Sequence, residues 1–330
     1  MLSTPTVEML WEPVDPHEAL PRRFKFADAR QLAAWVTDAL ADTWGVEVIS
    51  CDRVVISAGN ALVWITSSTG RMIFKWSVRS SLFARLANVA RLTSWLDGRG
   101  LPVSAPLPAL NGDLQVERNG FSMGLQSVVN GSMLDADNLA QVHAAGAELA
   151  RLHLALAEYS DAGPLGPGGQ ADSTPLRTRV EGWLNSTAGD HVTPLMESLR
   201  RRLGSLPSDT TLPPPQLVHL DIRSANLLCD GDRISAILDF EEAGIDHPVD
   251  DLAKAVVLLG TRFKHWGPVP PETQATFAAG YRAVRELSAP EAAWLGPLIL
   301  WRTLRLVPAG SDPTGWAESA RMQAGQRGAD

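Results

Sequence analysis

Apolar and polar positions in the first 130 residues follow first a helical period and then a strand pattern. Leu32, Val36 and Leu40 recur at helical spacing after Asp28, which predicts a capped helix. Short apolar runs bounded by turn residues come next, and they predict five strands with a helix between the third and the fourth. We expect the strands at 46–56, 62–66, 72–76, 113–117 and 121–129, and this second helix at 81–96.

After Gly131 the pattern becomes mainly helical, beginning with a long amphipathic stretch over 138–158. One hairpin interrupts it. Residues 226–229 and 233–239 have strand character on either side of the turn Asp230-Gly231. We therefore predict an α+β fold with two lobes. The N-terminal lobe, 1–127, carries a five-stranded antiparallel sheet with helix, and the C-terminal lobe, 128–330, is larger and mainly helical.

The hairpin region carries the most specific chemistry of the chain. His219, Asp221 and Asn226 form an H-x-D-x-x-x-x-N arrangement, and Asp239-Phe240 begins thirteen residues after Asn226. Phosphoryl transfer needs a carboxylate to orient the attacking hydroxyl, and an Asn and a second Asp to hold magnesium on the nucleotide. We predict that Asp221 is the catalytic base and that Asn226 and Asp239 bind Mg²⁺ at the open end of the hairpin. His219 is expected to bond the backbone of the loop.

Charged and aromatic residues near this motif are candidates for contacts with the phosphoryl group and the acceptor. Arg223 is placed to offset charge on the transferring phosphoryl group, although a surface arginine is the competing interpretation. The acidic residues after Asp239 would attract a cationic acceptor or bind the metal at its outer side, and tryptophans of the C-terminal helices would line a pocket. Solvated turns and core packing are the alternatives. The acceptor candidates are Glu241, Glu242, Asp246, Trp266 and Trp301.

Lys75 is unusual because the chain has only four lysines against twenty-five arginines. It lies in the predicted strand 72–76, among apolar neighbours, where an ammonium is costly unless an anion meets it. We predict that Lys75 binds nucleotide phosphates; a lysine extending from a sheet edge to solvent is the alternative. Gly59-Asn60, between the first two strands, is expected to form a turn over the phosphates, although such pairs mark turns in general.

Composition narrows the class of protein. The 330 residues are 45% hydrophobic and 20% charged, which is typical of a folded globular protein. A net charge of -8 disfavours binding to nucleic acid or to anionic membranes, and no apolar run approaches the roughly 20 residues of a membrane span. With two distant cysteines and no Lys or Arg in the first twenty positions, we expect a cytoplasmic protein.

With these motifs the chain resembles the aminoglycoside phosphotransferase and choline kinase-like family from about residue 46 to about residue 260. The resemblance implies a protein-kinase-like fold, ATP or GTP with Mg²⁺ as cofactors, and an adenine site at the backbone near Gln126 to Val128. It also implies that His153 packs in the core and that Asp251 caps a helix. The similar segments are 56–60, 73–75, 100–103, 148–153, 218–226, 239–243 and 248–253.

The chain departs from that family at two places. The helix over 80–96 has no acidic residue to pair with the strand lysine, and Asn88 is the nearest polar candidate by position. Leu220 stands where many relatives have Gly. We expect this second change to alter packing more than chemistry.

The leading hypothesis is a small-molecule kinase that phosphorylates a hydroxyl group. Its acceptor is a cationic antibiotic of the aminoglycoside type or, alternatively, a metabolite such as an amino alcohol, a homoserine-like compound or a sugar. A nucleotide-binding pseudokinase is a further alternative. A protein kinase is disfavoured because 242–250 is too short for a peptide-docking segment. The sequence does not distinguish ATP from GTP, and it does not indicate the oligomeric state.

Overall fold

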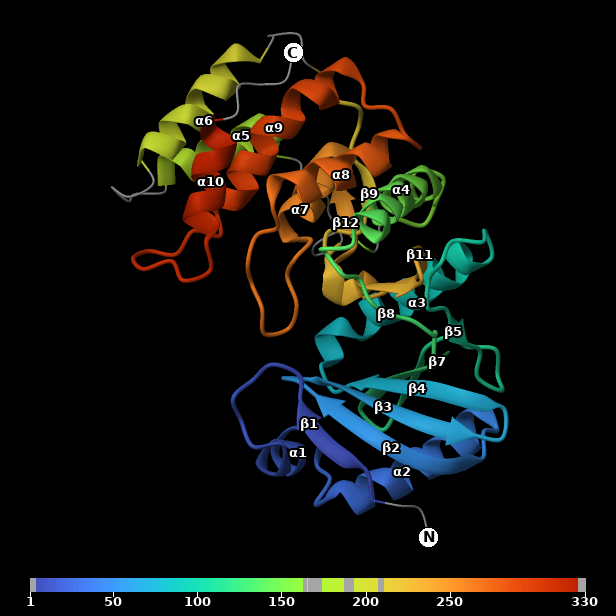
Figure 1. Ribbon diagram of the computed structural model, residues 1–330. Coiled ribbons are helices and arrows are strands. Elements are labelled where there is room, and N and C mark those ends of the chain that lie inside the picture. Colours follow the sequence, from blue (N-terminus) through green and yellow to red (C-terminus); the bar gives the residue numbers. More distant parts are fainter. Residues whose placement is uncertain (1–3, 163–164, 166–173, 187–192, 207–210, 326–330) are drawn as a thin grey trace. The chain divides into compact units, whose positions relative to one another are not determined.

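The chain divides into two compact units, residues 1–130 and 131–330. The computed structural model in Figure 1 describes residues 4–162, 165, 174–186, 193–206 and 211–325. No described helix combines the length and the apolar character that crossing a bilayer would require. The first unit is built around a sheet, and the second is mainly helical.

In the first unit, seven described strands form one sheet in the order β1-β2-β3-β4-β7-β5, with β6 paired to β7. The strands are β1 (Thr6–Met9), β2 (Val48–Ile56), β3 (Asn60–Ser67), β4 (Gly70–Ser77), β5 (Pro106–Leu107), β6 (Val116–Arg118) and β7 (Phe121–Ser127). The helices are α1 (Pro16–Phe24), α2 (Ala29–Trp44) and α3 (Phe83–Asp97).

The predicted sheet of five antiparallel strands is therefore two strands short of the observed sheet. The five predicted strands correspond to β2, β3, β4, β6 and β7, and the structure adds β1 and β5. β1 has four residues and pairs with β2 in parallel, and β5 has two residues. Runs this short carry no readable period, so only the pairing with a longer strand reveals them.

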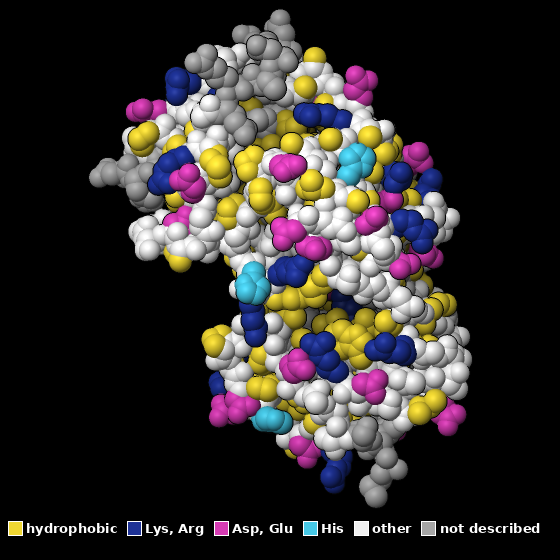
Figure 2. Space-filling model, in the orientation of Figure 1, with side chains coloured by type: hydrophobic (Ala, Val, Ile, Leu, Met, Phe, Trp, Pro, Cys, Tyr) yellow, Lys and Arg dark blue, Asp and Glu magenta, His cyan; other side chains and the backbone are white. Residues whose placement is uncertain are grey.

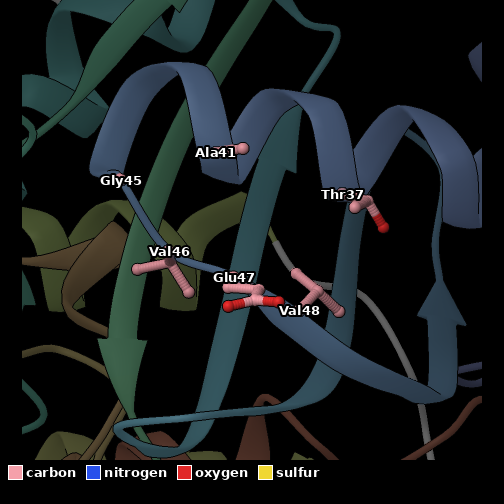
Figure 3. Close-up of a pocket in the computed structure, with 6 residues that line it drawn as sticks. All are labelled: Thr37, Ala41, Gly45, Val46, Glu47 and Val48. Carbon is pink, nitrogen blue, oxygen red and sulfur yellow. The ribbon is translucent and has the colours of Figure 1, made fainter.

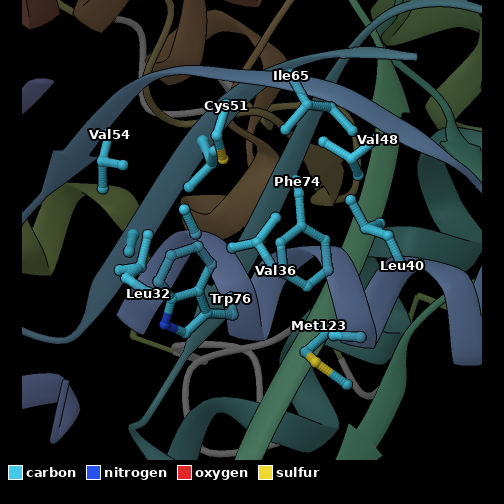
Figure 4. Packing of buried hydrophobic residues seen from close by; sticks show 14 of the residues in the cluster. Leu32, Val36, Leu40, Val48, Cys51, Val54, Ile65, Phe74, Trp76 and Met123 are labelled. Carbon is cyan, nitrogen blue, oxygen red and sulfur yellow. The ribbon is translucent and has the colours of Figure 1, made fainter. Parts of the chain in front are cut away.

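One face of this sheet is covered by α1 and α2 (Figure 1). The carboxylate of Asp28 accepts a hydrogen bond from the backbone N–H of Gln31, at 2.8 Å, which starts α2 as predicted. Figure 4 shows how side chains of α2 meet the inward side chains of the sheet in one apolar cluster. The residues labelled there are Leu32, Val36, Leu40, Val48, Cys51, Val54, Ile65, Phe74, Trp76 and Met123.

In the second unit, helices surround two small sheets. The described helices are α4 (Leu139–Leu156), α5 (Leu176–Ser186), α6 (Thr193–Ser205), α7 (Pro248–Leu258), α8 (Pro271–Arg282), α9 (Ala289–Leu304) and α10 (Trp316–Gly325). The strands are β8 (Ser132–Met133), β9 (Gln216–Val218), β10 (Leu227–Asp230), β11 (Arg233–Ile237) and β12 (Gly244–Asp246). They pair as β11-β10-β8 and as β12-β9.

Helices α4 and α8 pack unusually closely. A Cβ atom added to Gly146 on α4 would lie 2.0 Å from the carbonyl oxygen of Phe277, and one added to Gly280 on α8 would lie 2.0 Å from that of His143. Each helix therefore presents its glycine to the backbone of the other. The same helices carry His153 and Tyr281, which are part of the site described below.

Charges are interspersed over the surface. On the face visible in Figure 2, acidic and basic side chains alternate within each unit and do not gather into one field. A mixed surface of this kind agrees with the modest net charge of the chain and provides no extended basic area on this face.

Candidate active site

Two pairs of strands hold the predicted catalytic residues in the second unit. The loop 219–226 connects β9 to β10, and the loop 238–243 connects β11 to β12. Because β10 pairs with β11 and β9 pairs with β12, both ends of one loop lie beside both ends of the other. The hairpin was predicted. The β9–β12 pair was not, since three-residue strands leave too little pattern to recognise.

Asp221 and Asn226 meet at the centre of this arrangement. The Nδ2 atom of Asn226 donates to the Asp221 carboxylate at Oδ2, 2.7 Å away, and to the Asp221 backbone carbonyl, 2.8 Å away. Arg223 Nε also donates to Oδ2, at 3.1 Å. Among the described residues, the other carboxylate oxygen of Asp221, Oδ1, has no hydrogen-bond partner. Oδ1 is thus the oxygen left to accept a proton from an incoming hydroxyl.

The same contacts orient Asn226 for a cation. With its Nδ2 turned to Asp221, the amide oxygen Oδ1 faces the other way. The backbone carbonyl of Asn226 accepts from Leu238 N–H at 2.8 Å, which places the residue before Asp239 directly against Asn226. Asp239 itself is exposed. An amide oxygen and an exposed carboxylate are ligands that suit Mg²⁺.

These two residues would not hold a metal by themselves. Among the described residues there is no group of three or more His, Cys, Asp or Glu side chains arranged to bind one. Magnesium commonly takes one or two protein ligands and completes its shell with water and phosphate oxygens. The residues present therefore fit a metal that arrives with a nucleotide.

His219 holds the loop backbone, as the sequence predicted. Its Nε2 donates to the carbonyl of Leu238 at 3.0 Å, and its Nδ1 accepts from the backbone N–H of Asp221 at 3.1 Å. The side chain is fully buried. Burial lowers the pKa of His219, although the charges of Asp251 and Asp221 oppose the shift. A neutral imidazole is the form that these two hydrogen bonds require.

Asp251 does not cap α7, which corrects the expectation from the resemblance. α7 is preceded by His247, and the carboxylate of Asp251 accepts instead from the backbone N–H groups of His219, at 3.2 Å, and Leu220, at 2.9 Å. His153 forms a hydrogen bond of 2.9 Å to the same carboxylate through Nε2. Through Nδ1 it forms a second one, of 2.7 Å, to the hydroxyl of Tyr281. Burial alone would raise the pKa of Asp251, but the hydrogen bond and charge of His153 outweigh it and lower the pKa.

Two residues of these loops have left-handed backbone. Leu220 has φ of 64° and Asp239 has φ of 63°. For a residue with a side chain this conformation costs about 1–2 kcal/mol, and glycine avoids that cost. Leu220 keeps it because its N–H bonds Asp251 and its carbonyl accepts from Lys254. Leu220, at the position where the resemblance led us to expect Gly, therefore affects the backbone as well as packing.

The acceptor candidates have different surroundings. Asp246 is buried and paired through two hydrogen bonds, of 2.8 and 2.6 Å, with Arg179. Trp301 is only 3% exposed and packs under Arg302 at 4.5 Å. These two predictions are wrong for a site that must be open to an acceptor, because internal ion pairing and core packing occupy both side chains. Glu241 is half-buried and Glu242 exposed, directly after Asp239.

Asp250, four residues after Asp246, is also internal. It is completely buried and bonded by Arg302 through Nε, at 2.9 Å, and Nη2. Burial raises its pKa, against the influence of Arg302. Asp246 and Asp250 are therefore each paired with an arginine, which weakens the case for a cationic acceptor.

Arg223 and Trp266 lie against each other. The Arg223 guanidinium is 5.6 Å from the centre of the Trp266 ring, and Trp266 is 46% exposed. The indole N–H of Trp316 donates to the backbone carbonyl of Trp266 at 3.0 Å and anchors it. Of the predicted aromatic candidates, Trp266 is thus the one that is both accessible and in contact with a residue bonded to Asp221.

In the first unit, Lys75 occupies an interior strand. β4 lies between β3 and β7, and Lys75 is in register with Leu62 and Gly124. The neighbours Phe74 and Trp76 point into the core with α2, so Lys75 points to the opposite face, where it is half-buried. The alternative of a lysine at a sheet edge does not apply.

The Gly59-Asn60 turn is tied to the end of the lysine strand. The carbonyl of Gly59 accepts from the backbone N–H of Val78 at 3.0 Å and from the hydroxyl of Ser77 at 3.3 Å. The Arg79 side chain lies across Gly59, where an added Cβ would be 2.4 Å from Arg79 Cδ. No pattern along the chain selects Arg79, because only the fold brings it over the glycine.

The proposed adenine segment needs a correction at Val128. Its backbone N–H donates to the carbonyl of Arg71 at 3.0 Å, so it is not available to a base. The side-chain amide of Gln126 donates through Nε2 to the carbonyl of Ser104, also at 3.0 Å. In an antiparallel ladder alternate residues direct their N–H groups to opposite sides, and Ser127 therefore directs its own away from β4.

Asn88, the polar candidate by position on α3, is engaged within its own helix. Asn88 accepts a hydrogen bond from Arg91 on the same helix. α3 contacts β5 and β7, and none of its residues belongs to the α2 core.

The sheet unit also has a hollow of about 370 Å³ on its outer side, between the end of α2 and the start of β2 (Figure 3). Thr37, Ala41 and Glu47 are among the residues that line it. It lies on the α2 side of the sheet, whereas Lys75 points to the other face. With one charged residue in its lining, the hollow offers little chemistry.

Comparison with known proteins shows the family. Residues 52–294 match the APH phosphotransferase enzyme family. The chain is 27% identical over 267 residues to homoserine kinase of Methylobacillus flagellatus, a match that covers 76% of each protein. It is 26% identical over 258 residues to homoserine kinase of Neisseria meningitidis serogroup B, covering 75% of this chain and 78% of the relative.

Solved structures share the fold. An amicoumacin kinase in complex with AMP-PNP, Ca²⁺ and amicoumacin superposes with a TM-score of 0.57 at 17% identity, covering 88% of this chain and 91% of the other. A microcompartment-associated aminopropanol kinase gives 0.54 at 19% identity, with 88% and 94% covered. At such identities the likeness shows the fold and does not indicate the acceptor.

Proposed function

Because this chain belongs to the phosphotransferase enzyme family and is a phosphotransferase with a hydroxyl acceptor, we propose that it transfers the terminal phosphate of ATP to a small metabolite. We favour a hydroxyl compound of the homoserine or amino alcohol type over a cationic antibiotic. The pairing of Asp246 and Asp250 with arginines supports this choice, since it leaves two fewer unpaired carboxylates for a polycationic antibiotic. The homoserine kinases among the relatives agree with it.

The contact of Asn226 with Asp221 is the observation on which the mechanism depends. It leaves Asp221 Oδ1 to accept a hydrogen bond from the hydroxyl of the substrate, and it leaves Asn226 Oδ1 to face a cation. We assign Asn226 and Asp239 as magnesium ligands, and the metal would neutralise phosphate charge when bound. As the acceptor oxygen bonds to the γ-phosphorus, the bond from that phosphorus to the bridging oxygen of ADP breaks. The hydroxyl proton passes to Asp221.

Groups of the first unit would bind the nucleotide. We assign the Lys75 ammonium to the phosphates, with Gly59 and Asn60 as the turn that covers them. Arg79, which lies across Gly59, would add a second cation. For the adenine we assign the backbone of Ser127 in place of Val128.

A coupled assay of ADP release with Mg²⁺ and ATP tests this function. The acceptor panel contains L-homoserine, an amino alcohol, a sugar and an aminoglycoside. We expect release that depends on a small metabolite, and a loss of about 10²–10⁴-fold in kcat in Asp221→Asn. Asp230→Asn, the same change at the closed end of the hairpin, is the matched control and should retain activity. Nucleotide binding without transfer to any acceptor would contradict the proposal and favour a binding module.

A further inference from the structure

The guanidinium of Arg223 is bonded inside the site through Nε, and its two Nη atoms remain available. Nε donates to Asp221 Oδ2, and the side chain is 12% exposed. Within the described part of the chain, neither Nη atom makes a hydrogen bond or an ion pair. Arginine has five N–H donors in a planar fork, so the four on the Nη atoms remain for a ligand.

Trp266 gives that fork a fixed surface. Its ring lies 5.6 Å from the guanidinium, and its backbone is anchored by Trp316. Arg262 secures the beginning of the same loop by donating to the carbonyl of Leu134 at 2.8 Å. Single exposed apolar side chains are ordinary. What distinguishes Trp266 is that it supports a cation bonded to the catalytic carboxylate.

The Trp266 loop carries further basic side chains. Lys264 and His265, in the loop that carries Trp266, are exposed. Asp246 and Asp250 are each bonded to an arginine of their own. The positive charge on the Trp266 loop is therefore not cancelled by those two acids.

We propose that Arg223, supported by Trp266, binds a carboxylate of the acceptor, so that the acceptors are hydroxy acids of the hydroxy-amino-acid class. The two Nη atoms match a carboxylate in a bidentate pair. Since the same guanidinium is bonded to Asp221, a bound carboxylate would also position the hydroxyl near Asp221 Oδ1. The proposal rests on the proposed function and names the acceptor class for the same site.

Two acceptors that differ only in this group provide the test. 3-Amino-1-propanol has the chain of L-homoserine with hydrogen in place of the carboxylate. We expect the wild-type kcat/KM to favour homoserine, and Arg223→Gln to lower that preference at least about tenfold, chiefly through the KM for homoserine. Arg223→Lys keeps the charge without the planar fork and should recover part of it.

Two further variants separate recognition from folding and from net charge. Trp266→Ala changes an exposed side chain, so it should fold and still lower the preference. Arg282→Gln makes the same charge change on the exposed end of α8 and should keep the preference.

Each other outcome has a defined meaning. Equal loss of kcat for both acceptors in Arg223→Gln would place Arg223 on the transferring phosphoryl group and overturn the carboxylate site, while the proposed function would stand. A wild type without preference for homoserine would do the same. If the enzyme binds ATP and phosphorylates no small alcohol, the proposed function fails and the carboxylate site fails with it.

Discussion

At the scale of single residues, the site depends on hydrogen bonds that decide which atoms remain available. Asn226 and Arg223 share one oxygen of Asp221 and leave the other for a substrate. His219 holds two segments of backbone with its two ring nitrogens and is neutral for that purpose. The motif predicted Asp221, Asn226 and Asp239 as a set. Which oxygen faces outward is a property of rotamers and neighbours that spacing does not contain.

The neutral His219 predicts a dependence of stability on pH. Its pKa in the folded protein lies below the roughly 6.5 of an unfolded chain. Between the folded and the unfolded pKa of His219, the unfolded state binds more protons. The contribution of His219 to stability is therefore complete above about pH 6.5 and is lost as the pH falls below that value. Melting temperatures between pH 7.5 and 5.5 should decline more steeply for the wild type than for His219→Gln. Parallel slopes would argue against this role.

At the scale of elements, short contacts between backbones determine positions. The β9–β12 pair holds the start of the loop 219–226 beside the end of the loop 238–243. Asp251 on α7 accepts hydrogen bonds from two backbone N–H groups of the first of these loops. Behind α7, α4 and α8 approach so closely that only glycine fits at Gly146 and Gly280. Because His153 and Tyr281 stand on these helices and bond towards Asp251, the helix spacing is linked to the catalytic loop.

An alanine at Gly146 tests that linkage. The added methyl would meet the Phe277 carbonyl, a backbone atom that cannot turn aside, so we expect a loss of about 1–3 kcal/mol in the free energy of unfolding. Gly182→Ala in α5 is the matched control. Its Cβ meets nothing within 4 Å and should stabilise the helix by about 0.5–1 kcal/mol. Denaturant unfolding measures both, and similar values for the two would refute the packing argument.

At the scale of the whole molecule, the proposed nucleotide ligands are divided between two compact units. Lys75 and the Gly59 turn belong to residues 1–130, and Asn226 and Asp239 to residues 131–330. The proposed function assigns both sets to the nucleotide, each from the geometry of its own unit. Nucleotide binding is then expected to depend on magnesium and on residues from each unit.

Thermal unfolding with and without nucleotide measures that dependence. ATP with Mg²⁺ at about 100 times its Kd should stabilise the protein by about 2.7 kcal/mol. Removal of magnesium with EDTA, or the change Asp239→Asn, should abolish the metal-dependent part, and Lys75→Met should weaken the shift. Asp230→Asn should leave it unchanged. A shift that survives both EDTA and Asp239→Asn would exclude Asp239 as a metal ligand.

The sequence by itself determined the α+β class, the capped helix α2, the main strands and the catalytic motif. Each of these depends on neighbours along the chain or on a period repeated over many residues. The tertiary structure alone decided the seven-stranded sheet, the left-handed Leu220, the Asp251 network and the burial of Asp246 and Trp301. These depend on contacts between segments far apart in sequence, where a two-residue strand or a single acid carries no local signal of its partner.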